Sequence, residues 1–176
     1  MTVLAEVSFG SDLPAVVIGN IHMNAKNSSG ASAARQIEAY RRQVDLTAQF
    51  VDQHWDRQLP FVFAGDFNMG TVKARRDYLF ASSLQVGDDN DGLTQLASQG
   101  SIPHGADAIM HHGADFQFYF SSPNWRLEAT EVSIPFGAAN ANKQLSDHVG
   151  FVVRYRFVPL LEQGFQNSVK QVNDAA

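Results

Sequence analysis

The chain has 176 residues, with 13 Lys or Arg against 18 Asp or Glu, which gives a formal charge of −5. A hydrophobic fraction of 44% and a length close to that of one average domain exclude extensive disorder. The absence of cysteine excludes a disulfide scaffold, a zinc finger, an iron–sulfur site and thiol catalysis, and no apolar run is long enough to span a membrane.

The first half of the chain has a strand–helix–strand pattern. Residues 14–21 are a short β-branched run that predicts a strand, and small polar residues at 26–34 predict a loop. From residue 35 to about residue 57, apolar side chains recur at steps of three and four, which predicts one long helix. Residues 61–65 predict a second strand. A crossover of this length joins neighbouring strands of one sheet, so the unit predicts an α/β fold.

The pattern is weaker in the second half of the chain. Residues 71–82 have helical character, and a short helix is expected around residues 160–169. Further strands are predicted at residues 115–120, 126–134 and 149–157. Because no repeat, low-complexity tract or linker interrupts the sequence, we expect residues 1–176 to form a single domain.

Several predicted strands are apolar at successive positions rather than at alternate ones. The runs are Val16-Val17-Ile18, Phe61-Val62-Phe63 and Phe151-Val152-Val153. Because side chains of a strand point alternately to the two faces of a sheet, these strands are apolar on both faces. The long helix can cover one face, but the chain is short of elements to cover the other. The sequence therefore predicts an incomplete domain.

Polar side chains gather where the predicted strands begin or end. They are Asn20 and His22 after the first strand, Asp66 and Asn68 after the second, Asp115 before the third, and Asp147 and His148 before the last. Each alone has an ordinary explanation, because Asp and Asn are common turn residues and a single His beside a core strand is more often structural. The combination points to a functional site, because an α/β scaffold usually places its site at strand ends.

This set of side chains meets the needs of phosphodiester hydrolysis. A carboxylate–imidazole pair can orient and polarise an attacking water. Oxygen ligands can hold a divalent metal that neutralises phosphoryl oxygens, and amide and imidazole donors can stabilise the charge that develops on phosphorus. The strand-end residues therefore predict a metal-assisted hydrolase as one interpretation.

Two small basic clusters lie outside these segments. Arg41-Arg42 falls in the long predicted helix, and Lys73, Arg75 and Arg76 follow the second strand. The second cluster is close enough in sequence to Asp66 and Asn68 to contact a polyanionic substrate. A solvated helix face is the simpler expectation for both clusters.

The strand-end segments resemble the endonuclease/exonuclease/phosphatase superfamily, which includes pancreatic-type deoxyribonucleases, abasic-site endonucleases, bacterial neutral sphingomyelinases and inositol polyphosphate 5-phosphatases. The matches, in the family's order, are Asn20-Ile21-His22, Gly65-Asp66-Phe67-Asn68, Asp115 and Ser146-Asp147-His148. They lie within residues 14–157 and correspond to the C-terminal half of the family's domain. The resemblance implies the second half of a four-layer α/β/β/α sandwich, with a mostly antiparallel mixed sheet and a long covering helix.

The resemblance implies roles for the last motif and for a metal. His148 would be the general base for the attacking water, and Asp147 would be its partner or a metal contact. The cofactor would be Mg²⁺, with Mn²⁺ and Ca²⁺ as alternatives that also suit oxygen ligands. The family's metal-binding Glu belongs to the N-terminal half of the domain, and Glu6 lies in the wrong context to replace it.

The resemblance also implies roles for the earlier motifs. Asp66 and Asn68 would hold the scissile phosphate and the nucleophile, and His22 would donate a hydrogen bond to a phosphate oxygen. Asn20 would contribute to substrate binding beside them. Asp115 would orient His22 from behind.

The function expected from the resemblance is that of a Mg²⁺-dependent phosphodiesterase acting on a lipid or on a nucleic acid. The charge of −5 and the lack of an extended basic stripe favour a sphingomyelinase-like hydrolase over an enzyme for duplex DNA, with a nuclease as the alternative. A second interpretation is an inactive half-domain that acts as a binding or complementation module, because the Glu is missing. The partner would be a separate N-terminal half-domain or a second copy. The compartment stays open, with a secreted or periplasmic bacterial location as one option.

Overall fold

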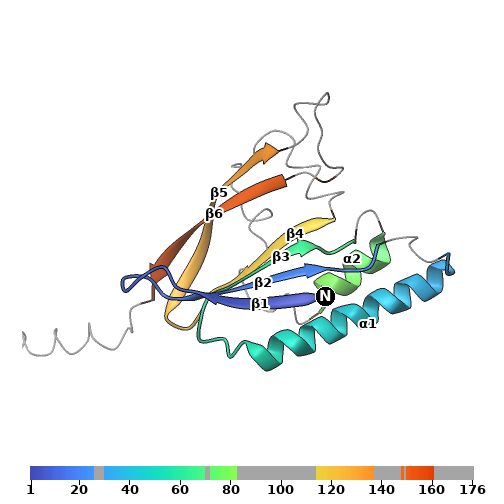
Figure 1. Cartoon of the computed structure of the whole chain (residues 1–176), viewed down its shortest axis with the longest axis horizontal. Coiled ribbons are helices and arrows are strands. Elements are labelled where there is room, and N and C mark those ends of the chain that lie inside the picture. Colours follow the sequence, from blue (N-terminus) through green and yellow to red (C-terminus); the bar gives the residue numbers. More distant parts are fainter. Residues whose placement is uncertain (26–29, 70–71, 83–113, 137–147, 149, 161–176) are drawn as a thin grey trace, which may run out of the picture.

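The computed structural model describes residues 1–25, 30–69, 72–82, 114–136, 148 and 150–160. In chain order its elements are β1 (Thr2–Val7), β2 (Val16–His22), α1 (Ala33–His54), β3 (Phe61–Asp66), α2 (Lys73–Phe80), β4 (Asp115–Phe120), β5 (Trp125–Phe136) and β6 (Gly150–Pro159). Figure 1 shows α1 and α2 on one side of the sheet β1–β4, with β5 and β6 on the other side. The expected helix at residues 160–169 lies outside the described residues.

The main sheet has four strands in the order β1-β2-β3-β4, and β5 pairs with β6 in a second sheet of two strands. The β2–β3 pair is parallel, as the helical crossover requires, whereas β1–β2, β3–β4 and β5–β6 are antiparallel. This arrangement confirms the predicted α/β fold with a mixed, mostly antiparallel sheet. Neither described helix combines the length and apolar character needed to cross a membrane.

Strand β1 was not predicted from the sequence. Its residues, TVLAEV, include Ala5 and Glu6, which strands tend to exclude, and the strand lies at the edge of the sheet with several exposed side chains. It forms because it pairs with β2 from Thr2, opposite Ile21, to Val7, opposite Val16. A long-range pairing of this kind is not visible in a local pattern.

Helix α1 confirms the long helix expected from the apolar spacing. The side chain of Ser32 accepts a hydrogen bond from the Arg35 amide at the N-terminus, and buried side chains follow at Tyr40, Val44, Thr47 and Val51. This buried stripe packs on one face of the main sheet, in a core built mainly from Phe side chains of β3 and β4. The helix therefore covers one face of the sheet, as expected from the sequence.

The opposite face of the main sheet is covered only in part. Val62 of β3 and Tyr119 of β4 pack with Leu127, Ala129 and other side chains of β5 and β6. On the neighbouring strands, Ile18 of β2 is 38% exposed and Val3 of β1 is 49% exposed. The second apolar face predicted from the sequence thus has a covering layer over β3 and β4, while these side chains of β1 and β2 remain exposed in the described structure.

Candidate active site

The strand pairing brings three predicted site residues into one row. His22 lies opposite Asp66 in the β2–β3 pair, and Asp66 lies opposite Asp115 in the β3–β4 pair. Directly opposed residues share one face of a sheet, so their side chains start within about 5 Å of their neighbours. Positions separated by more than forty residues in sequence thus become adjacent at one end of the main sheet.

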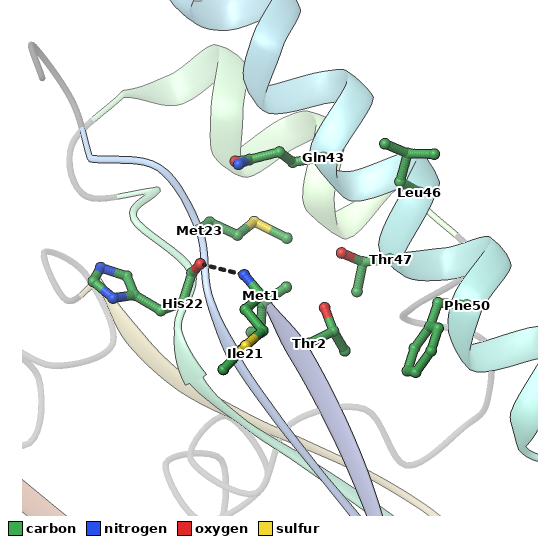
Figure 2. A pocket seen from close by; sticks show the side chains of 9 residues that line it. All are labelled: Met1, Thr2, Ile21, His22, Met23, Gln43, Leu46, Thr47 and Phe50. Atoms are coloured by element: carbon green, nitrogen blue, oxygen red, sulfur yellow. Dashed lines mark hydrogen bonds between the residues drawn. The ribbon is translucent and has the colours of Figure 1, made fainter. Parts of the chain in front are cut away.

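His22 is the most exposed member of this row, with a side chain that is 71% accessible. It also borders a cavity of about 260 Å³ at the ends of β1 and β2, next to α1. Figure 2 shows that the imidazole of His22 points away from the α1 side chains Leu46 and Phe50 that line the other side of this cavity. The cavity is therefore a neighbour of the candidate site and contains none of the site's carboxylates.

A glycine before Asp66 allows β2 and β3 to approach closely at this end. Gly65 has φ +149°, and a Cβ atom at this position would lie 2.0 Å from the Ile21 carbonyl oxygen. No other residue type fits this contact without movement of the backbone. The close approach places the Asp66 side chain beside the end of β2.

Asp66 and Asn68 form a compact turn after β3. The Asn68 amide donates to Asp66 Oδ1 at 2.8 Å, and Asn68 Nδ2 donates to Asp66 Oδ2 at 2.9 Å. The same Nδ2 also donates to the Met23 carbonyl at 2.8 Å, which ties the turn to the segment after β2. Asn68 has φ +48°, a left-handed conformation that Asn tolerates better than most residues. The Asp66 carboxylate is therefore held by its own turn.

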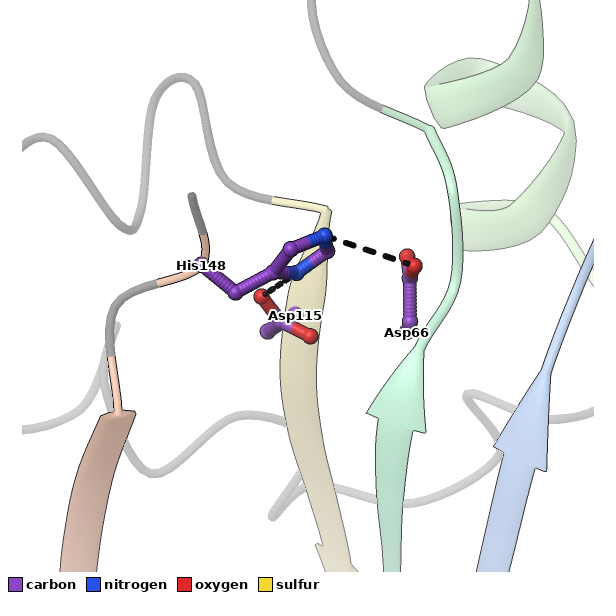
Figure 3. A group of neighbouring side chains, drawn as sticks. All are labelled: Asp66, Asp115 and His148. Atoms are coloured by element: carbon purple, nitrogen blue, oxygen red, sulfur yellow. Dashed lines mark hydrogen bonds and ion pairs between the residues drawn. The ribbon is translucent and has the colours of Figure 1, made fainter. Parts of the chain in front are cut away.

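His148, which precedes β6 by two residues, completes the group (Figure 3). Its Nδ1 lies 2.6 Å from Asp115 Oδ2, and its Nε2 lies 4.0 Å from Asp66 Oδ2. His22 Nε2 approaches the same Asp66 oxygen at 3.5 Å. An ionised Asp115 accepts from Nδ1–H, so this contact makes Nε2 the acceptor nitrogen of a neutral His148.

The contact of Asp115 differs from the expected one. The resemblance implied that Asp115 orients His22, but the carboxylate of Asp115 bonds His148 instead. The reason is the strand order, because β3 lies between β2 and β4 and therefore places Asp66 next to His22. Asp147 lies outside the described residues.

Asn20 and Arg75 are two further residues that the sequence analysis singled out and that have a described position. Asn20 is exposed on β2 and opposes Ala64, one row inside the His22 row on the same face. Arg75 was expected on a solvated helix face, but it is only 1% exposed, so this expectation is wrong. A signal was available in the sequence, because Arg75 precedes the apolar Leu79 by four residues and shares its side of the helix.

The site offers some of the ligand atoms that a divalent metal needs. One ligand atom each from Asp66, Asp115 and His148 lie within 4.8 Å of one another. Carboxylate oxygens suit Mg²⁺, Mn²⁺ and Ca²⁺, whereas an imidazole nitrogen suits transition metals better. The group therefore fits an oxygen-bound metal in part, through Asp66 and Asp115.

Comparisons of the sequence with protein-family models and with curated proteins find no match. Comparison of the structure with solved structures does find similar folds. Humanized D. rerio TDP2 with 14 mutations has a TM-score of 0.63 at 16% identity, over 88% of this chain and 60% of that chain. The human Nocturnin catalytic domain with bound sulfate has a TM-score of 0.57 at 18% identity, over 89% of this chain and 52% of that chain.

A third solved structure carries the family name itself. The endonuclease/exonuclease/phosphatase from Beutenbergia cavernae DSM 12333 has a TM-score of 0.54 at 19% identity, over 88% of this chain and 39% of that chain. This chain thus spans 60% or less of the length of each of these three structures. Together with the motifs that the sequence presents in the family's order, the similarity shows that the chain has the fold of the endonuclease/exonuclease/phosphatase superfamily.

Proposed function

We propose that this chain carries the water-activating part of a metal-dependent phosphodiester hydrolase. The observation that carries the proposal is the arrangement of His148 between two carboxylates, with Nδ1 at 2.6 Å from Asp115 and Nε2 at 4.0 Å from Asp66. A carboxylate on one ring nitrogen stabilises the imidazolium that forms when the other nitrogen takes a proton. His148 is therefore proposed as the general base and Asp115 as the residue that orients it.

The separation between His148 Nε2 and Asp66 Oδ2 suits a bridging water. Two acceptors 4.0 Å apart can both bind one water at about 2.8 Å from each. A water held there would give one proton to Nε2 while Asp66 keeps its oxygen aligned for attack on phosphorus. Asp66 is only 16% exposed, so its position is defined by the surrounding protein more than by solvent.

His22 is proposed to contact a non-bridging phosphate oxygen. Its side chain is exposed, and its Nε2 lies 3.5 Å from the Asp66 Oδ2 that His148 Nε2 approaches at 4.0 Å, so both imidazoles lie beside the same carboxylate oxygen. Asn68 Nδ2 donates to both the Asp66 carboxylate and the Met23 carbonyl. Asn68 is therefore proposed to orient Asp66. Asn20, exposed on the same face of β2, is proposed as a further substrate contact.

Mg²⁺ is proposed as the cofactor, with Mn²⁺ and Ca²⁺ as alternatives. Asp66 and Asp115 offer carboxylate oxygens at the site, and Asp147 is a further proposed ligand. A bound divalent metal supplies neutralisation of the charge on the phosphoryl oxygens. The chain's own contribution is to position the water and to accept its proton.

The proposed substrate is a phosphodiester of a lipid or of a nucleic acid. One similar structure is described as D. rerio TDP2 complexed with a single-strand DNA product, which keeps a nuclease as an alternative. The arginines of β5 and β6 do not form a basic stripe, because Arg126 and Arg156 pair with Glu128, and Arg154 pairs with Glu131. This pairing supports the preference for a sphingomyelinase-like substrate over duplex DNA.

A second candidate function is that of a half-domain that needs a partner. Two observations favour it: the chain spans only part of each similar structure, and Val3 and Ile18 are exposed on the face that carries the candidate site. A separate half-domain, or a second copy of the chain, could cover these side chains and add the missing metal ligand. In that case the isolated chain would be inactive although its water-activating groups are in place.

Hydrolysis of bis-p-nitrophenyl phosphate tests the first proposal. The assay compares the chain with Mg²⁺, the chain with EDTA, and the His148→Ala variant with Mg²⁺. Turnover that needs Mg²⁺ and is lost in the variant supports a complete hydrolytic site. Turnover equal to that of the variant contradicts activity of the chain alone and favours the half-domain.

A further inference from the structure

Arg75 is a buried cation that contacts the two segments carrying the candidate site. Its Nη1 donates to the Asn24 carbonyl at 3.0 Å and to the Asn68 carbonyl at 2.9 Å. Asn24 belongs to the segment after β2, two residues beyond His22, and Asn68 belongs to the turn that holds Asp66. One nitrogen of one side chain therefore joins both segments.

The two segments are also bonded directly to each other beside Asp66. The Met23 amide donates to the Asp66 carbonyl at 2.9 Å, and Asn68 Nδ2 donates to the Met23 carbonyl. Arg75 adds a link from a third element, because it lies on α2. Its guanidinium carbon also lies 4.7 Å from the ring centroid of Tyr40 on α1, a cation–π contact.

Stability alone does not explain a buried arginine at position 75. None of the ion pairs among the described residues involves Arg75, and its burial lowers the pKa of the guanidinium. Among the described residues, Arg75 Nη2, Tyr40 OH and Asn24 Oδ1 are buried without a hydrogen-bond partner. Burial is also the main reason that the pKa of Tyr40 is raised. An apolar side chain at position 75 would avoid these desolvation costs.

We propose that Arg75 is a positioning residue, which sets the distance between His22 and Asp66 by fixing the carbonyls of Asn24 and Asn68. The importance of this distance for hydrolysis rests on the proposed function. The positioning by Arg75 does not depend on that function, because it can be measured in the absence of turnover. Arg75 would act through the Asn24 and Asn68 carbonyls and not by contact with the proposed water.

The test compares Arg75→Met with Arg76→Met. Both variants remove one charge from the same turn of α2, but Arg76 is only half-buried and belongs to the neighbouring side of the helix. Hydrogen exchange is measured at the Met23 and Asn68 amides, which donate to the carbonyl and the carboxylate of Asp66. Arg75→Met should accelerate exchange at both amides by about tenfold or more. This is the loss of protection expected when a charge-assisted hydrogen bond is removed. Arg76→Met should leave both rates unchanged.

A second control separates positioning from general loosening of α2. Leu79→Ala removes a fully buried side chain from the same helix without touching either carbonyl. If the chain hydrolyses the test diester, Arg75→Met should lower kcat by about 10- to 100-fold with little change in KM, the scale expected for misplaced catalytic groups. Leu79→Ala should lower the melting temperature but leave kcat of the folded protein nearly unchanged. Arg75→Lys keeps the charge and should be intermediate in both measurements.

Equal exchange in Arg75→Met and Arg76→Met would overturn the proposal. If Arg75→Met does not fold, the same comparison is made between Arg75→Lys and Arg76→Lys, and equal rates there overturn it as well. If Leu79→Ala loses as much kcat as Arg75→Met, the effect of Arg75→Met comes from general loosening of α2, and Arg75 is not a positioning residue. Absence of turnover in the unmodified chain would contradict the proposed hydrolysis only, since the exchange rates still decide whether Arg75 positions the two segments.

Discussion

Asp115 contacts His148 directly, with Oδ2 2.6 Å from Nδ1 of the imidazole. An amide at this position would keep the shape of the side chain but offer an N–H as readily as an oxygen. The imidazole would then lose both its preferred tautomer and the stabilisation of its protonated form.

We therefore expect Asp115→Asn to lower kcat for the test diester by about 10³- to 10⁴-fold, as found when the carboxylate of a hydrolytic triad is replaced by an amide. The control is Asp45→Asn, which changes an exposed carboxylate on α1 that bonds Tyr78. Steady-state kinetics with Mg²⁺ measure the effect. A loss in Asp115→Asn no larger than in Asp45→Asn would contradict the assignment of Asp115 as the orienting residue.

Gly65 is the second residue whose chemistry can be tested directly. We expect Gly65→Ala to lower the free energy of unfolding by about 2–4 kcal/mol, because the new Cβ would lie 2.0 Å from the Ile21 carbonyl and φ is +149°. Urea denaturation measures this value. The control is Gly30→Ala, where φ is +63° and no described atom lies within 4 Å of the added Cβ, so only the backbone strain is present. Equal losses would show that the clash is relieved by a small backbone shift.

At the scale of elements, β5 and β6 are joined by an ion pair between Glu128 and Arg156. Arg156 Nε donates to Glu128 Oε2 at 3.1 Å, and this hydrogen bond is the main reason that the pKa of Glu128 lies below its ordinary value of 4.5. A lowered carboxyl pKa stabilises the folded state when the group is ionised. The stabilisation is therefore complete above pH 4.5 and is lost as the pH falls below it, through the lowered pKa.

We expect Glu128→Gln to lower the melting temperature at pH 7 and to have a smaller effect as the pH falls below 4. Circular dichroism melts between pH 7 and pH 3 measure the difference between the variant and the unmodified chain. Glu131→Gln is the control, since it removes the more exposed Glu131–Arg154 pair from the same two strands. Because both pairs are partly solvated, the differences should be small. A constant difference across this pH range would mean that Glu128 acts through packing rather than through its charge.

At the scale of the whole molecule, the main sheet has one face buried under α1 and α2 and the other covered over β3 and β4. Val3 and Ile18 are exposed beside the site residues, so part of an apolar sheet face meets solvent. An exposed face of this kind promotes association or dye binding. A specific dimer could cover it in trans, as two-fold sheet packing allows.

We expect the isolated chain to self-associate or to bind a hydrophobic dye, and Ile18→Ser to reduce either effect. Size-exclusion chromatography with light scattering and dye fluorescence measure the two outcomes. Leu46→Ser is the matched control, because Leu46 is 54% exposed but lies on α1, away from this face. A soluble monomer with little dye binding would contradict the half-domain interpretation.

The order of the elements could largely be predicted from local sequence. The long helix follows from its apolar spacing, and β2, β3, β4, β5 and β6 follow from β-branched and aromatic runs. The order of the polar motifs at strand ends was also enough to indicate the superfamily fold, which the structural similarity confirms. These features depend on residues that are close together in sequence, so they can be recognised from local patterns in one sequence.

Three features were decided only by the tertiary structure. β1 forms because it pairs with β2, and Asp115 contacts His148 because β3 separates Asp115 from His22. Arg75 joins the segments after β2 and β3 because the carbonyls of Asn24 and Asn68 both accept hydrogen bonds from it. Each depends on which strands or segments become neighbours, and that choice is set by contacts between residues far apart in sequence. The sequence by itself determined the residues and chemistry available to the site, and the strand order determined which of them meet.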